Sequence, residues 1–407
     1  MVHRKRSIIL DGTCKLRFIL CLLAGLIISN ITVSIALAES WNIFDKGRSK
    51  MNTNQEEREV IRLIKEKFQR ETGDIAWSTD GKWIATTGVS RQVVIWDAAS
   101  LSIRHQMEQT GKGYGSDNIT FSPDSRYVAS GSGIIDVWGV ADGSHHMTLI
   151  APHITPGIPQ NVGVRSLRFR PDGKMLVVIY DGETQMVIAY RTADGKIAWS
   201  YEPKRFLEPE RKGSPSITTP LVFTPDGKKV ILGTQERGSD DLNLKMLTRI
   251  LALDADTGTH LGSIDDVHVE GPTALTVSID GKWLATGTDT GSKRQTRNRK
   301  TRRFVSIDNK DPVRIWSLET GKLAKELPVL CRVRHLAFSR DGKYLFGAID
   351  EAKNHLALVV WDVESGKIVQ KVVSKPLPVA LAISPDGRRL ATAREAGISI
   401  YEITGGD

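Results

Sequence analysis

The chain has 407 residues, of which 40% are hydrophobic and 25% are charged, and its formal net charge is +9 at pH 7. This composition is sufficient to bury a large core, which excludes a globally disordered chain. The 36 glycines and 16 prolines favour many turns over a few long helices.

Residues 1–38 have the three parts of a secretory signal peptide. Five cations and one acid lie within residues 1–17, an apolar run covers 18–28, and Ala36 and Ala38 place small residues before the expected cleavage point. We therefore expect an exported protein, periplasmic or extracellular, with a polar linker over 39–58. The alternative is an uncleaved anchor that contacts the membrane, because residues 18–38 are just long enough to span a bilayer.

Cleavage after residue 38 lowers the formal charge from +9 to +5, since five cations and one acid leave with the signal. Cys331 is then the one remaining cysteine, so no internal disulfide can form. An exported chain without disulfides must be held together by packing and hydrogen bonds.

A repeat organises residues 59–407. Turns centred on Asp, usually Asp-Gly, separate two runs of alternating apolar residues, as in AWSTDGKWIATTG and AISPDGRRLATAR. Asp and Gly tolerate the positive φ of tight turns, so each repeat predicts a β-hairpin. The seven turns are centred at 80, 124, 172, 226, 280, 341 and 386, about 51 residues apart.

A third predicted strand follows each hairpin and ends in an aromatic residue, except at Leu253. A second tight turn and a fourth strand come next. Four antiparallel strands repeated seven times predict an all-β fold, a seven-bladed β-propeller of four-stranded antiparallel blades. The aromatic ends are Trp96, Trp138, Tyr190, Trp316, Trp361 and Tyr401.

The last repeat supplies only three strands before the chain ends. The spacing of the other repeats assigns residues 61–67 to the missing outer strand, so that an N-terminal strand closes the ring. Residues 60–68 also have apolar residues at helical spacing, preceded by a capping-box pair, Asn54 and Glu57. We expect a strand, because an unclosed ring would leave an exposed edge.

On these repeats the chain resembles the WD-repeat propellers over residues 60–407. Trp96-Asp97 and Trp361-Asp362 are the WD dipeptide itself, and the SPDG-type hairpin also fits. The chain lacks the Gly-His dipeptide that precedes the first strand of each blade in that family. The resemblance implies a non-enzymatic platform for partner proteins.

The longest connections fall between the second and third strands of repeats four and five, and after repeats two and three, at 144–164 and 200–217. Strand alternation places both kinds of connection on one face of the propeller, opposite the short turns. Because loops on a rigid scaffold usually carry function, we expect the loop-rich face to bind a partner.

One connection, in repeat five, has seven cations and no acid within residues 293–303. Without these cations the mature chain would have a net charge of −2. Such a cluster attracts phosphates or carboxylates, although a merely solvated loop is the alternative reading. The loop has no interleaved aromatics, which disfavours nucleic acid and favours a protein partner or an anionic envelope component. The cluster comprises Lys293, Arg294, Arg297, Arg299, Lys300, Arg302 and Arg303.

No other motif predicts a catalytic, metal or cofactor site. The histidines at 145, 146 and 153 have no acidic or cysteine residue at ligand spacing, and we assign them to a solvated loop. The glycines at 111–115 precede a strand and not a helix, so they do not form a phosphate loop. The acidic pairs at 240–241 and 265–266 are read as solvated, and common hydrolase signatures are absent.

The alternative function is a propeller enzyme or cofactor carrier that uses the central channel. Segments 189–199 and 252–262 resemble the blade motif of pyrroloquinoline-quinone dehydrogenases, in which glycine turns and tryptophans pack the blades. Only the first segment ends in tryptophan, Trp199, and the chain has no adjacent cysteine pair. We therefore expect a non-catalytic, monomeric binding platform without a cofactor.

Overall fold

The computed structural model divides the chain into two compact units, Met1–Glu56 and Glu57–Asp407. The first unit lies outside the described residues, and with it the predicted signal peptide and nearly all of the predicted linker. Among the residues that are described, no helix is long and apolar enough to cross a membrane. The structure describes residues 59–68, 72–88, 91–111, 118–152, 163–181, 185–203, 216–237, 246–269, 271–288, 294–297, 304–307, 311–328, 332–351, 355–373, 378–394 and 397–404.

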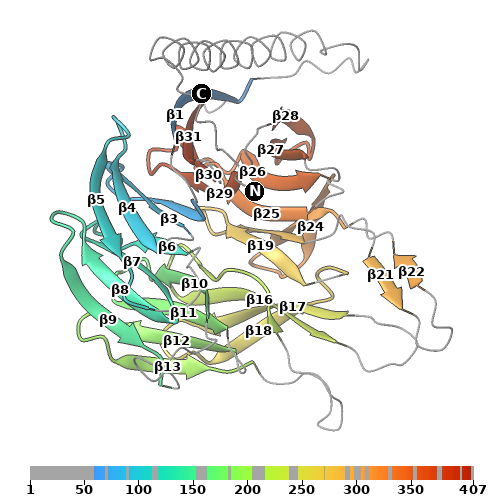
Figure 1. Ribbon diagram of the computed structural model, residues 1–407. Coiled ribbons are helices and arrows are strands. Elements are labelled where there is room, and N and C mark those ends of the chain that lie inside the picture. The colour runs from blue at the N-terminus through green and yellow to red at the C-terminus, as the bar shows by residue number, and fades with distance from the viewer. Residues whose placement is uncertain are drawn as a thin grey trace, which may run out of the picture. The chain divides into compact units, whose positions relative to one another are not determined.

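The second unit is a ring of seven antiparallel sheets, which Figure 1 shows in chain order from blue through green to red. The first strand of each blade is innermost, and the later strands follow outward. The predicted seven-bladed propeller is therefore confirmed. Four blades are regular: β2 (Asp74–Trp77), β3 (Trp83–Thr87), β4 (Gln92–Asp97) and β5 (Ile103–Glu108) in blade one; β6 (Ile119–Phe121), β7 (Tyr127–Ser132), β8 (Ile134–Gly139) and β9 (His145–Ile150) in blade two; β10 (Gly163–Phe169), β11 (Met175–Asp181), β12 (Met186–Arg191) and β13 (Ile197–Tyr201) in blade three; and β25 (Arg332–Phe338), β26 (Tyr344–Glu351), β27 (His355–Asp362) and β28 (Ile368–Val373) in blade six.

Blade four has a divided inner strand. Pro220 lies between its two parts, and a proline cannot donate to a β-ladder. The hydroxyl of Thr219 instead accepts a hydrogen bond from Gly233 N at 2.6 Å, which keeps the second strand attached. The strands of blade four are β14 (Ser216–Ile217), β15 (Val222–Phe223), β16 (Lys229–Arg237), β17 (Met246–Asp254) and β18 (His260–Asp265).

Blade five contains an inserted hairpin. Its four blade strands pair in the order β19-β20-β23-β24, and the strands β21 and β22 form a two-stranded sheet of their own. The bounds are β19 (Pro272–Val277), β20 (Trp283–Thr288), β21 (Arg294–Arg297), β22 (Phe304–Ile307), β23 (Val313–Ser317) and β24 (Leu323–Leu327).

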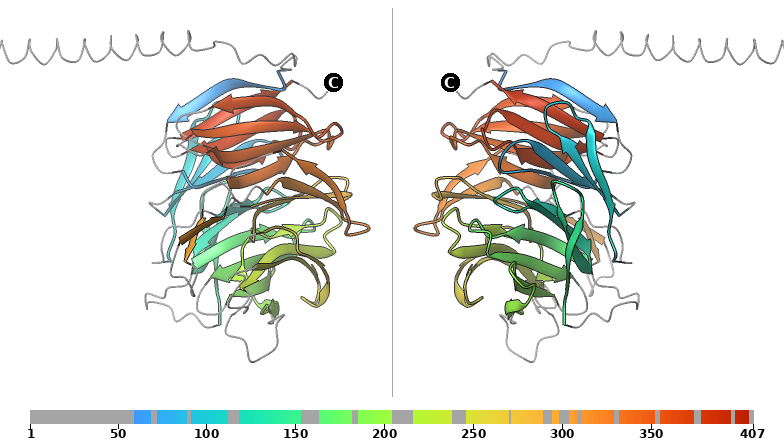
Figure 2. Two further views of the ribbon diagram at one scale, coloured as in Figure 1. Left: turned by 90° about the vertical axis from the view of Figure 1, so that its right-hand side faces the viewer. Right: turned by 90° about the vertical axis from the view of Figure 1, so that its left-hand side faces the viewer.

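Blade seven joins the two ends of the propeller. Its strands are β29 (Pro378–Ile383), β30 (Arg389–Arg394), β31 (Gly397–Ile403) and the N-terminal strand β1 (Ile61–Phe68), which pairs antiparallel with β31. Figure 2 shows β1, in blue, against the red C-terminal strands. The predicted closure by a strand, and not a helix, is confirmed. Ile61 and Tyr401 are buried in the same apolar cluster, and Glu66 accepts a hydrogen bond from Arg394 at 2.8 Å.

The hairpin turns are fixed by side chains as well as by glycine. In blade one, Ser78 Oγ donates to Asp80 Oδ1 at 2.6 Å and accepts from Trp83 N at 2.9 Å, while Gly81 has a φ of 72°. The same Ser/Thr–Asp bond recurs in every blade except blade three, where Arg170 takes the place of the hydroxyl residue. The other pairs are Ser122–Asp124, Thr224–Asp226, Ser278–Asp280, Ser339–Asp341 and Ser384–Asp386.

The apolar core lies between blades and not within single ones. Trp96 of blade one is 1% exposed and packs in a cluster with Ala391 and Ile400 of blade seven. Trp361 of blade six shares its cluster with Ile315 of blade five. The buried apolar residues thus form seven clusters, one at each interface between neighbouring blades.

We expect Gly258→Ala to destabilise the propeller by about 2–4 kcal/mol. Gly258 has a φ of +71°, and an added Cβ would lie 2.5 Å from Cε3 of the Trp199 ring. Gly342→Ala is the matched control, because Gly342 has a φ of +73° with no atom within 4 Å of an added Cβ. The control should show only the backbone strain, about 1–2 kcal/mol. Equal losses of stability in the two variants, measured by chemical denaturation, would show that the close contact with the Trp199 ring does not contribute.

Candidate binding sites

The structure places part of the predicted basic cluster on the inserted hairpin of blade five. Arg294 and Arg297 are the first and last residues of β21, where they pair with Ile307 and Phe304 of β22. Lys293, Arg299, Lys300, Arg302 and Arg303 lie outside the described residues. Trp283 of β20 pairs with Ser317 of β23. The second and third strands of the blade therefore pair directly, and the inserted hairpin is not part of the blade sheet.

The assignment of the paired histidines to a loop is wrong. His145 and His146 belong to β9, the outer strand of blade two, because the long connection begins only after this strand. His145 Nε2 lies 3.1 Å from Asp136 Oδ1, and the His146 ring is 4.4 Å from the Tyr127 ring. His153 lies outside the described residues.

The structure describes one of the two acidic pairs, at residues 265–266. Asp265 lies in β18, where its carboxylate is 3.0 Å from Arg249 Nε, and Asp266 follows with a φ of 52°. Residues 240–241 lie outside the described residues. Asp265 is therefore ion-paired and not simply solvated.

A buried hydrogen-bond network in blade five was not predicted. Trp316 Nε1 donates to Thr286 Oγ1 at 2.9 Å, and the same hydroxyl lies 2.8 Å from His268 Nε2. His268 Nδ1 is 3.1 Å from Asp311 Oδ2, and both side chains are almost fully buried. The network connects the segment before β19 with β20, with β23 and with the residue that enters β23. The sequence did not indicate this network, because His268 follows Val267 and therefore does not form a Gly-His dipeptide.

The charge of Asp311 is held in place by its partners. Burial alone would raise the pKa of this carboxyl, but the hydrogen bond and charge of His268, the amide of Val269 and the nearby Arg314 together lower it below its usual range. Arg314 Nη1 is 3.2 Å from Asp311 Oδ1, and Val269 N donates to Oδ2 at 2.7 Å. The Oδ2 atom thus accepts a backbone hydrogen bond, and the negative charge is balanced by Arg314 within the protein. In blade one only the Trp96–Thr86 bond, 3.0 Å long, is present in the described residues.

The inner strands place a histidine and an arginine within electrostatic range of each other. His335 comes from β25 of blade six and Arg168 from β10 of blade three. Burial and then the positive charge of Arg168 lower the pKa of His335 to about 4. The ring is therefore neutral near pH 7 in the folded protein.

This neutral histidine should make the propeller sensitive to acid. The unfolded chain binds a proton at His335 near pH 6.5, whereas the folded chain does so only near pH 4. Stability should therefore fall as the pH is lowered from 6.5 to 4, by up to about 3 kcal/mol from this residue. Urea denaturation of His335→Asn across this range should show a smaller loss than the wild type. Identical pH profiles would contradict the assignment.

At five of the seven interfaces, adjacent blades are linked by a side chain at a repeating position of the outer strand. The third strand of each blade ends in an aromatic residue, or in Leu253 in blade four. The linking position of the outer strand pairs with the residue just before that one. Lys325 Nζ donates to Val363 O at 2.7 Å, and Trp199 Nε1 donates to Ala255 O at 3.0 Å. We call this residue the interblade pin. From the interface of blades seven and one onward, the pins are Lys65, His105, Met147, Trp199, Gly262, Lys325 and Gln370.

Five of the seven pins hydrogen-bond to the next blade. Lys65 Nζ donates to Ala99 O at 2.5 Å, and His105 Nε2 lies 3.1 Å from Ala141 O. Gln370 accepts from the amides of Val60 and Ile61 and donates to Ile61 O. At the other two interfaces the pin position has no donor side chain, because it holds Met147 or Gly262.

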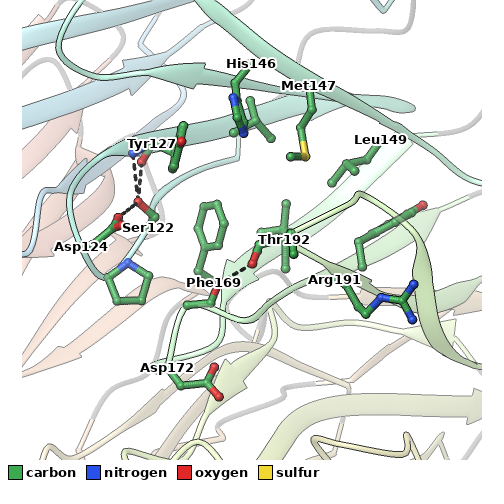
Figure 3. Close-up of a pocket in the computed structure, with 16 residues that line it drawn as sticks. Ser122, Asp124, Tyr127, His146, Met147, Leu149, Phe169, Asp172, Arg191 and Thr192 are labelled. Carbon is green, nitrogen blue, oxygen red and sulfur yellow. Dashed lines mark hydrogen bonds between the residues drawn. The ribbon is translucent and has the colours of Figure 1, made fainter.

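The interface of blades two and three contains a pocket of about 600 Å³. It lies on the face that carries the short turns, between the hairpin turns of the two blades and the outer turn of blade three. Figure 3 shows side chains of blade two, including His146 and Met147, facing Phe169 and Thr192 of blade three. The pocket is thus on the face opposite to the long connections.

The comparisons agree with the fold. Residues 72–97, which form three strands of blade one, match the family model for the WD domain, G-beta repeat. The chain is thus a seven-bladed β-propeller in which blade one matches a WD repeat. Proteins of this class typically serve as protein-binding platforms.

Among individual proteins, the chain is distantly similar to Protein HIR1 from Mycosarcoma maydis. The two are 26% identical over 106 residues, which is 26% of this chain and 10% of that protein. The chain thus matches about a tenth of its relative's length.

Proposed function

We propose that the protein is an exported, non-catalytic propeller that binds a protein or an anionic envelope component through its loop-rich face. The inserted hairpin of blade five carries the proposal. Blade five pairs β20 with β23 directly, so β21 and β22 are additional to the blade. An insertion that the fold does not require, and that concentrates cations, is best explained by contact with a partner.

The charge distribution supports an anionic partner. All of the net positive charge expected for the mature chain lies within residues 293–303, since the remainder has a net charge of −2. Clustered cations raise the local concentration of anions, and arginines can bind carboxylates or phosphates with two parallel hydrogen bonds. The contact should weaken with salt because the charges are screened.

Export is supported by the basic, apolar and small-residue order of residues 1–38. The mass of the protein isolated from its own cells tests this part of the proposal. A chain that begins at residue 39 supports secretion, and a full-length chain in the membrane fraction would favour the anchor.

Binding is tested by replacing the seven cations of residues 293–303 with glutamine. A matched control removes seven cations from the opposite face, where each hairpin turn has one cation two residues after its Asp. The probes are an extract of the native envelope and vesicles of equal phosphatidylglycerol and phosphatidylcholine. The control residues are Lys82, Arg126, Lys174, Lys228, Lys282, Lys343 and Arg388.

At 20 mM salt we expect the loop variant to lose at least tenfold in binding to one of the two probes, and the control to lose less than threefold. If the wild-type protein retains one identified envelope protein and the loop variant does not, the partner is a protein. If the wild-type protein sediments with vesicles and the loop variant does not, the partner is a lipid. Equal losses in both variants would show a dependence on net charge alone, and no loss in either would refute the proposal.

A further inference from the structure

The pocket between blades two and three is where an interblade pin should lie, but none of the described residues supplies a donor there. Met147 occupies the pin position, paired with Val137 of β8. It lines the pocket together with Thr192 and Ala193 of the blade three turn. A thioether cannot donate a hydrogen bond to a carbonyl group.

The same turn in other blades accepts a basic side chain. Thr192 and Ala193 stand at the turn positions of Val363 and Glu364 in blade six, and the carbonyls of both those residues accept from Lys325 Nζ. In blade one the equivalent of Ala193 is Ala99, and its carbonyl accepts from Lys65. No residue in the described part of the chain donates to the carbonyl oxygen of Thr192 or Ala193.

The pocket lining suits a long side chain that has a cationic group at its end and an aliphatic stem. Apolar walls come from both blades and include Leu149, Phe169 and Leu176. Asp124 and Asp172 contribute carboxylates, and their side chains are 52% and 36% exposed. Arg191, the one arginine or lysine in the lining, is bound through two bonds to Asp194. A lysine or arginine side chain matches this combination.

We propose that this pocket binds a lysine or arginine side chain presented by a partner protein. The ammonium or guanidinium group donates to the carbonyl oxygens of Thr192 and Ala193, as Lys325 does within the ring, and the stem packs on Met147 and Phe169. The partner thus supplies the donor that the described residues lack at this interface. The site extends the proposed platform function to the second face, but it does not depend on residues 293–303.

The test uses the full chain with ¹³C-labelled alanine and threonine methyl groups. The probes are Nα-acetyl-lysine N-methylamide and its norleucine analogue, which has the same stem without the ammonium. We expect the lysine probe, but not the norleucine probe, to shift the methyl resonances of Ala193 and Thr192 in a saturable manner. Equal shifts with both probes, or none with either at 20 mM, would overturn the proposal.

Met147→Lys supplies the absent donor from within the chain. It should weaken binding of the lysine probe at least tenfold and raise the thermal midpoint, whereas Met147→Leu should keep the affinity within threefold. Met147→Trp places at this position the residue type of Trp199, and it is a second way to fill the pocket if lysine disturbs packing. Undiminished binding in both occluding variants would refute the site.

Two further variants separate the possible failures. Asp124→Asn with Asp172→Asn should weaken the lysine probe about threefold to tenfold, and an unchanged affinity would contradict the role of the carboxylates. The variant neutralised over 293–303 should bind the probe as the wild type does. Loss of probe binding there would contradict the independence of the two sites, while loss of envelope binding alone concerns the proposed function.

Discussion

Removal of residues 1–70 should open the ring and destabilise the propeller by about 5 kcal/mol or more. This deletion takes away β1, in which Ile61 is 2% exposed, and the preceding Val60, which is fully buried. Burial of two such side chains contributes about 3–6 kcal/mol. The ladder to β31 and the Glu66–Arg394 bond are lost as well, and β31 becomes an exposed edge that favours aggregation.

Removal of residues 1–56 is the control, because it keeps β1 intact. Its thermal midpoint should match that of the full chain, while the longer deletion should unfold earlier and sediment as aggregates. A synthetic peptide of residues 57–70 should restore the monomer by adding the missing strand. A monomeric 71–407 chain with an unchanged unfolding transition would show that β1 does not close the ring.

Asp311→Ala should cost about 3–5 kcal/mol, because it leaves the buried partners of the carboxylate unsatisfied. The side chain of Asp311 is 1% exposed and holds His268 against Thr286. The matched control is Asp350→Ala, which removes an ion pair with Arg334 that is about one-third exposed on both sides. The control should lose no more than about 1 kcal/mol in urea denaturation.

The Asp311 network also has a pH signature. The folded-state pKa of this carboxyl lies below the unfolded value of about 3.8, so its contribution is present above pH 4 and lost as the pH falls through the folded pKa. The wild type should therefore lose more stability than Asp311→Ala below pH 4. Parallel acid profiles of the two proteins, measured by near-ultraviolet circular dichroism, would contradict this charge assignment.

The fold was predictable because its signals are local and periodic. Most of the Asp turns use a hydroxyl and a glycine within a few residues, so the hairpin around Asp80 can be predicted from its own residues. The third strands end at aromatic residues that fill the space between blades. The closing strand followed from counting, since blade seven has no other candidate for its outer position.

The sites were less predictable because they depend on register between distant residues. Asp311 reaches His268 only because the chain returns to blade five after the inserted hairpin, and no short motif contains both residues. The pins share a position but not a residue type, since Met147 and Trp199 occupy equivalent places. The repeat therefore predicted where blades lie, but not which chemistry joins them.

The meeting of the two ends in blade seven has a consequence for the order of the blades along the chain. Thr404 N donates to Val60 O at 2.8 Å, and Thr404 Oγ1 donates to Glu59 O at 2.9 Å. A short linker from residue 404 to residue 59 would make blade seven continuous, and new ends could be opened in any exposed hairpin turn. The propeller is thus a circle whose starting point is arbitrary in structural terms, so circular permutation can place a fused domain beside any chosen blade.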